Sequence, residues 1–127
     1  MKLKILIADD LKFVRISICE ILQKEGFIVC GEAENGSAML SKYEAVKPDI
    51  VLLDITMPVM DGLTALKILK NNHPDAKVIM CSALGQQKYI IRAIQLGASD
   101  FVVKPFKPER LVSSINKTMK LDKSNDR

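Results

Sequence analysis

The stretch DIVLLDITMPVMDG, residues 49–62, decides how this chain can fold. Its apolar run at residues 50–53 is short and rich in leucine and β-branched side chains, which is typical of a strand buried in a parallel sheet. The run ends at the carboxylate of Asp54, and residues 57–62 form a loop rich in turn residues. We therefore expect Asp54 at the carboxyl end of a buried strand.

Two further strand-like runs end in charged side chains. LKILIA immediately precedes Asp9 and Asp10, and FVV immediately precedes Lys104. In an open α/β sheet, the functional crevice lies outside the carboxyl ends of the strands. We therefore expect Asp9, Asp10, Asp54 and Lys104 to meet at one edge of the sheet.

The rest of the chain alternates between apolar runs and helical patterns. Residues 27–30 and 78–81 are the remaining expected strands. Five βα units in this order predict a doubly wound parallel sheet with helices on both faces. We expect one domain over residues 1–121 and a polar tail at residues 122–127. The five helices are expected to end near residues 26, 46, 70, 97 and 121.

Composition favours one globular domain. The chain has 127 residues, of which 48% are hydrophobic and 27% charged, so it can bury a core. Its apolar runs fall short of the ~20 residues that a transmembrane helix needs. Asp9 and Asp10 interrupt the only candidate signal-peptide core at the N-terminus. We expect a soluble, cytoplasmic protein without membrane insertion.

The net charge of +4 raises the question of nucleic-acid binding. The lysines are spread along the chain, and only the segment after residue 104 concentrates positive charge, with acidic residues among it. The chain has no tryptophan, and aromatic residues do not alternate with the basic ones. This pattern favours a solvated face over a nucleic-acid groove.

The clustered charges point to metal-assisted phosphoryl chemistry. Three carboxylates held close together repel unless a hard dication lies among them, and Mg²⁺ suits an open site of carboxylates, water and phosphate. A carboxylate can also attack phosphorus, and a lysine would balance the charge on the transferring oxygens. Asp54 is the expected nucleophile, Asp9 and Asp10 the metal-holding pair, and Lys104 the fixed positive charge.

Ser82 closes the fourth expected strand at the same edge. Its hydroxyl could donate a hydrogen bond to a phosphoryl oxygen. Alternatively, it is a capping or turn serine ahead of the next loop. The residues themselves leave both interpretations open.

Together these residues carry a family resemblance. The chain resembles bacterial two-component response-regulator receiver domains over essentially its whole length, and especially the single-domain chemotaxis regulators of that family. The resemblance implies a flavodoxin-like (βα)5 fold with strand order 2-1-3-4-5. The motifs that carry it are Asp9-Asp10, DIVLLD (49–54), MPVMDG (57–62), Ser82-Ala83, GASDF (97–101) and VKPF (103–106).

The resemblance implies a role for each site residue. Asp54 matches the phosphoacceptor, which a CheA-like histidine kinase or a small phosphodonor would modify. The implied Mg²⁺ ligands are Asp10 directly, Asp9 mainly through water, Asp54, and the backbone carbonyl of Thr56. Lys104 matches the lysine that binds the phosphoryl group.

The resemblance also implies a switch and a docking surface. Ser82 and Phe101 match the switch pair, and the bond between Lys104 and Pro105 is expected to be cis. Partners would dock on the fourth helix, fifth strand and fifth helix. The flagellar motor switch protein is the expected target in chemotaxis, with a phosphatase as a possible further partner. The implied protein is a monomeric signalling module that assists its own phosphorylation and dephosphorylation, rather than an enzyme.

Three alternatives remain at this point. A haloacid-dehalogenase-like phosphatase would share an Asp nucleophile, Mg²⁺ and a lysine. Such enzymes usually carry a second aspartate two residues after the nucleophile, where this chain has Thr56. The chain could also be the receiver part of a longer transcriptional regulator, or an intermediate in a phosphorelay.

Overall fold

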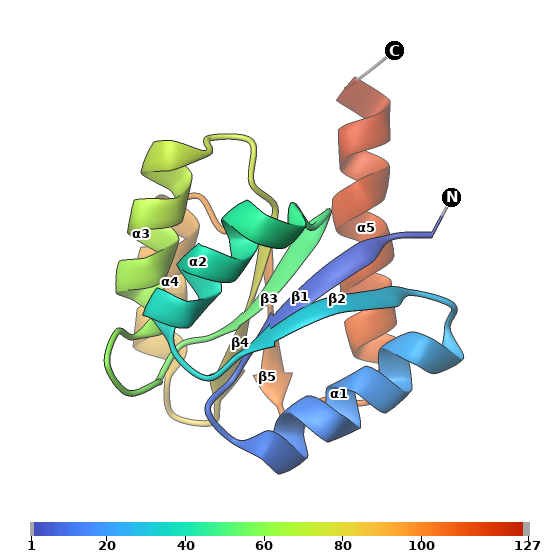
Figure 1. Cartoon of the computed structure of the whole chain (residues 1–127), viewed down its shortest axis with the longest axis horizontal. Coiled ribbons are helices and arrows are strands. Elements are labelled where there is room, and N and C mark those ends of the chain that lie inside the picture. Colours follow the sequence, from blue (N-terminus) through green and yellow to red (C-terminus); the bar gives the residue numbers. More distant parts are fainter. Residues whose placement is uncertain (1, 126–127) are drawn as a thin grey trace.

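One parallel sheet organises the fold in the order β2-β1-β3-β4-β5, as expected. The computed structural model describes residues 2–125 (Figure 1). β1 and β3 lie inside the sheet, and their residues from Ile5 to Ala8 and from Ile50 to Asp54 are buried. The strands are β1 (Lys4–Ala8), β2 (Ile28–Ala33), β3 (Ile50–Asp54), β4 (Val78–Ala83) and β5 (Asp100–Lys104).

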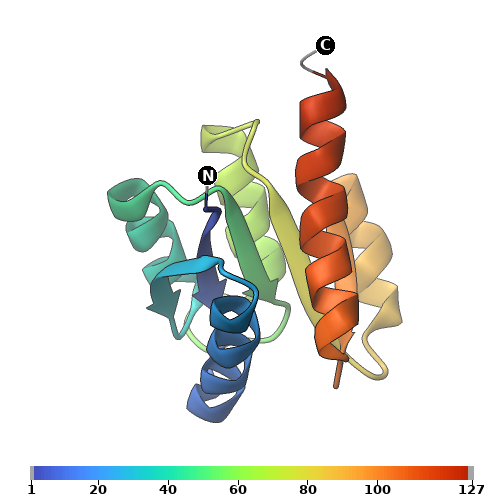
Figure 2. The same ribbon diagram turned by 90° about the vertical axis from the view of Figure 1, so that its right-hand side faces the viewer.

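Helices cover both faces of the sheet, which confirms the doubly wound architecture. α1 and α5 pack on one face, and α2, α3 and α4 pack on the other (Figure 2). Among the described residues, no helix is both long enough and apolar enough to cross a membrane. The helices are α1 (Lys12–Lys24), α2 (Gly36–Val46), α3 (Gly62–Asn72), α4 (Gln87–Gln95) and α5 (Pro108–Asn125).

β2, β4 and α5 are among the elements that extend beyond their expected ends. β2 continues to Ala33, because as an edge strand it can carry the exposed Glu32 while pairing with β1. β4 continues to Ala83, whose pairing partner is Lys104. α5 runs to Asn125 instead of ending near residue 121, so its polar end is helical; residues 126 and 127 of the expected tail lie outside the described residues.

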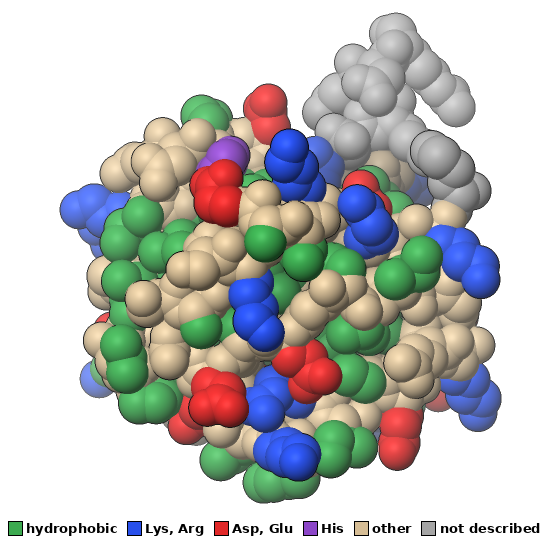
Figure 3. Space-filling model, in the orientation of Figure 1, with side chains coloured by type: hydrophobic (Ala, Val, Ile, Leu, Met, Phe, Trp, Pro, Cys, Tyr) green, Lys and Arg blue, Asp and Glu red, His purple; other side chains and the backbone are tan. Residues whose placement is uncertain are grey.

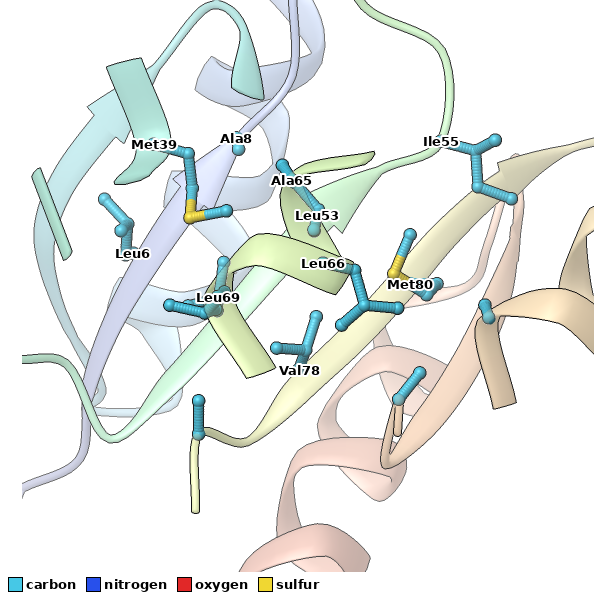
Figure 4. Close-up of a cluster of buried hydrophobic side chains, with 14 of the residues drawn as sticks. Leu6, Ala8, Met39, Leu53, Ile55, Ala65, Leu66, Leu69, Val78 and Met80 are labelled. Carbon is cyan, nitrogen blue, oxygen red and sulfur yellow. The ribbon is translucent and has the colours of Figure 1, made fainter. Parts of the chain in front are cut away.

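The larger core lies between the sheet and the helices α2, α3 and α4. Leu53 and Met80 from the sheet pack against Leu66 and Leu69 of α3 (Figure 4). All four side chains are at most 1% exposed. Because alternate residues of a strand point to opposite faces, Leu52 and Ile79 belong instead to the second core, under α1 and α5. The two cores fix the sheet edge where the charged residues end their strands.

The start of α3 lies very close to the end of β3. A Cβ added at Gly62 would come within 2.0 Å of the backbone oxygen of Asp54. The Gly62 N–H donates a 2.8 Å hydrogen bond to the Ile55 carbonyl, which holds the two segments together. Asp61 begins the helix by accepting a 2.8 Å hydrogen bond from the Thr64 N–H. A glycine is therefore required for the loop to return against Asp54.

We expect the Gly62→Ala substitution to lower the free energy of unfolding by about 3 kcal/mol, because a backbone atom must move to admit the methyl group. Urea denaturation measures this change. Gly31→Ala is the control, since its Cβ would meet side chains rather than backbone, the nearest being Leu6 at 3.2 Å. Equal losses for the two variants would contradict the close packing of α3 against β3.

Candidate functional site

The sheet order brings the charged strand ends together. Asp9 follows β1, Asp54 ends β3 and Lys104 ends β5. Asp9, Asp10 and Asp54 each offer a carboxylate oxygen within 4.8 Å of the others. The structure thus places these four side chains at one edge, as the strand-end pattern predicts.

Lys104 bridges the two buried carboxylates. Its Nζ donates a 2.9 Å hydrogen bond to Oδ2 of Asp9 and lies 3.2 Å from Oδ1 of Asp54. The Asp9 and Asp54 side chains are only 2% and 8% exposed, whereas Asp10 is exposed. The other Asp9 oxygen accepts a hydrogen bond from the Leu11 N–H at 2.9 Å. One ammonium group therefore lies against two buried carboxylates and can balance the charge of only one of them.

The pKa of Asp54 reflects this shortage of positive charge beside two buried carboxylates. Burial raises the pKa of Asp54 from 3.8 to about 6; attraction to Lys104 opposes the rise, and repulsion by Asp9 adds to it. Burial alone would lower the pKa of Lys104, but its hydrogen bond with Asp9 and the attraction of Asp54 raise it overall. Lys104 therefore stays charged near neutral pH, and Asp54 is the carboxylate that is costly to ionise.

The donor set fits a hard divalent cation. Three carboxylates and one ammonium leave an excess of negative charge in a site that Asp10 opens to solvent. Carboxylate oxygens at this spacing are ligands that Mg²⁺ and Ca²⁺ prefer, and Mg²⁺ tolerates a site with few protein ligands. The residues present therefore suit Mg²⁺.

Ser82 is fully buried near the end of β4. The residue before it, Cys81, pairs with Asp54 of the neighbouring strand β3. Its Oγ has no hydrogen-bond partner among the described residues. The interpretation as a capping serine is therefore wrong, since its hydroxyl caps nothing. A buried hydroxyl without a partner is costly, so a nearby acceptor would stabilise it.

Phe101 lies on β5, opposite Met80 of β4. It is partly buried against the core under α2, α3 and α4. Strand alternation puts Ser82 on the same face as Met80, so the two residues of the expected switch pair share one face of the sheet. The bond between Lys104 and Pro105 is cis, as predicted.

Thr56 is exposed in the loop that follows β3, two residues after Asp54. Its Oγ1 accepts a hydrogen bond from Nε2 of Gln86 at 2.6 Å. Sequence reasoning missed Gln86, because no sequence motif identifies it. Its contact with Thr56 depends on how the two loops fold.

Sequence reasoning also missed Arg15, which is 8% exposed on α1. Its Nη1 donates to the Asp9 carbonyl at 2.7 Å, and its Nε donates to Glu32 at 3.1 Å. Arg15 therefore holds the backbone of the acidic segment against β2. Its position one turn before Ile18 and two turns before Leu22, on the buried stripe of α1, was a usable signal.

The expected docking surface carries exposed apolar side chains on α4. Ile91 is 67% exposed and Ile94 48%, whereas Ile90 is buried. Ile90 therefore lies on the buried side of α4, and the exposed apolar residues are its neighbours.

Comparison with known proteins gives a consistent result. Residues 5–116 match the response regulator receiver domain family. The chain is 54% identical to the chemotaxis protein CheY of Bacillus subtilis, over 91% of this chain and 97% of that protein. It is 50% identical to CheY of Thermotoga maritima, over 92% and 98% of the two chains. A chain of the CheX-CheY-BeF3-Mg+2 complex from Borrelia burgdorferi superposes with a TM-score of 0.88 at 34% identity, covering 92% of this chain and 89% of that one.

Proposed function

Because the chain belongs to the response regulator receiver domain family, we propose that it is a CheY-like regulator phosphorylated on Asp54 in a Mg²⁺-dependent reaction. The observation that carries the proposal is the cluster of Asp9, Asp10 and Asp54 at the sheet edge, with the Nζ of Lys104 against Asp9 and Asp54. The similarity of the chain to CheY proteins supports a role in two-component chemotaxis signalling. We propose that phosphorylation changes the affinity of the protein for a partner.

The geometry supports Asp54 as the phosphoacceptor. With a pKa of about 6, its carboxylate is mostly ionised at neutral pH and can act as a nucleophile. A carboxylate oxygen attacks phosphorus, and the bond between phosphorus and the donor's nitrogen or oxygen breaks. The nearby ammonium of Lys104 stabilises the charge on the phosphoryl oxygens.

Asp9, Asp10, Asp54 and the backbone carbonyl of Thr56 are the proposed Mg²⁺ ligands. When bound, Mg²⁺ would offset the repulsion among the carboxylates and the incoming phosphoryl group. The Ser82 hydroxyl, which lacks a partner, would gain one in a phosphoryl oxygen. This new hydrogen bond favours a changed arrangement of the end of β4, and Phe101 on the same face would follow.

We propose a CheA-like histidine kinase as the phosphodonor and a flagellar motor switch protein as the output partner. The output surface would be α4, β5 and α5, where Ile91 and Ile94 are exposed. A phosphatase is a further candidate partner. We propose that the protein acts as a cytoplasmic monomer without membrane insertion and by binding, rather than as an enzyme. On the face in Figure 3, basic and acidic side chains are interspersed, which favours protein partners over direct nucleic-acid binding.

The proposed chemistry can be tested by incubating the protein with acetyl phosphate and measuring its intact mass. We expect the mass of one phosphoryl group to be added with Mg²⁺ present, and little or none with excess EDTA. Peptide mapping should place the group on Asp54. Asp54→Asn is the control that removes the nucleophile and keeps the shape of the side chain. Equal incorporation by this variant, or incorporation unaffected by EDTA, would refute the proposal.

A further inference from the structure

The side chain of Gln86 connects the two loops that flank Asp54. Its Oε1 accepts a 2.7 Å hydrogen bond from the Ala83 N–H, at the end of β4. Its Nε2 donates a 2.6 Å hydrogen bond to Oγ1 of Thr56, in the loop after β3. One amide group thus satisfies two partners that are separated by 27 residues in the sequence.

The backbone reinforces this connection. The Gln86 N–H donates to the Ala83 carbonyl at 3.2 Å, so Ala83 is bonded to Gln86 through both of its backbone polar groups. Ala83 directly follows Ser82, whose buried hydroxyl has no partner in this arrangement. The same conformation therefore gives the Ala83 backbone its hydrogen bonds and leaves the Ser82 hydroxyl without one.

A movement of Ser82 toward a group on Asp54 must also displace its chain neighbour Ala83. That displacement stretches or breaks the hydrogen bond to Gln86, which is also bonded to Thr56. The bridge consequently favours the arrangement in which Ser82 lacks a partner, and it opposes the rearrangement that would provide one.

We propose that Gln86 is a positioning residue that restrains the β4–α4 loop in the unphosphorylated form and so sets the switching equilibrium of this protein. The inference rests on the proposed function, because it concerns the response to a phosphoryl group on Asp54. Gln86 acts through Ala83 and Thr56 and takes no part in the transfer. Removing its amide releases both loops and lowers the cost of reaching the phosphorylated arrangement.

Gln86→Met tests this inference, since methionine has a similar length and lacks the amide. The measurement is the affinity for beryllofluoride, a phosphoryl mimic, by titration calorimetry with Mg²⁺. We expect affinity about three- to tenfold tighter than wild type, the effect of losing one or two hydrogen bonds that favour the unbound form. Gln87→Met is the matched control, because Gln87 is exposed and adjacent. Unchanged or weaker binding by Gln86→Met would overturn the inference.

Thr56→Val removes only the hydroxyl end of the bridge, so it should tighten binding less and in the same direction. A second readout needs neither metal nor mimic: with EDTA, amide hydrogen exchange at Ala83 should be about tenfold faster in Gln86→Met than in Gln87→Met. Equal exchange rates would show that the bridge does not hold Ala83, which would also overturn the inference.

The two proposals fail in different ways. If wild-type protein does not bind beryllofluoride, the proposed function fails, and the inference fails with it because there is no phosphorylated arrangement for Gln86 to oppose. If wild type binds and Gln86→Met matches Gln87→Met, only the inference fails. A purely structural role would lower thermal stability without tightening the binding of the mimic, and that result also counts against the inference.

Discussion

Asp54→Asn should raise the free energy of unfolding of the metal-free protein at neutral pH by about 2–3 kcal/mol. Burial raises the pKa of this carboxyl from 3.8 to about 6, a difference worth about 3 kcal/mol at about 1.36 kcal/mol per pKa unit. Because the pKa is raised in the folded state, the contribution of Asp54 favours folding below about pH 3.8. It is lost as the pH rises through about 6.

Asparagine resembles the protonated acid, so the gain from Asp54→Asn should be present at about pH 7.5 and nearly absent at about pH 4. Urea denaturation with EDTA at both pH values measures this. Lys104 keeps its hydrogen bond to Asp9 in the variant, so no buried ammonium is left unpaired. Asp10→Asn is the control; it removes a charge from the same cluster at an exposed position, where solvent screens it. A gain that does not depend on pH would contradict the role of burial.

The fold was predictable because each apolar run ends at a charge or a turn. Asp54 and Lys104 mark the ends of β3 and β5 within the sequence itself. The strand order came from the family resemblance, since hydrophobic patterns do not specify which strands pair. The extension of β2 to Ala33 was missed because exposed Glu32 breaks the apolar pattern, and only pairing with β1 maintains the strand.

The site was predictable where its residues depend on the sheet and unpredictable where they depend on loops. Asp9 and Asp54 are positioned by parallel strands whose ends must coincide. Ser82 stayed ambiguous because the partner of a hydroxyl depends on tertiary packing. The bridge from Gln86 to Thr56 requires two loops to approach within the length of one side chain, and no spacing in the sequence encodes that approach.

Lys104→Met is expected to lower the free energy of unfolding by about 3 kcal/mol at neutral pH in the metal-free protein. The structure places its Nζ against both Asp9 and Asp54, and the substitution leaves two buried carboxylates that repel each other. The loss should shrink in acid, because Asp54 can take up a proton and relieve the repulsion. Lys107→Met, at an exposed lysine nearby, should cost much less.

A double-mutant cycle separates this charge effect from lost packing. If repulsion causes the loss, Asp54→Asn should stabilise the Lys104→Met protein by more than it stabilises wild type, since it removes one of the two unpaired charges. If methionine merely packs badly, the two substitutions should be additive within about 0.5 kcal/mol. Additivity would mean that Lys104 does not balance Asp54 in the folded protein. A larger gain from Asp54→Asn in the Lys104→Met protein than in wild type would instead show that Asp54 is held ionised mainly by this lysine. Lys104 would then keep the Asp54 carboxylate nucleophilic despite its burial.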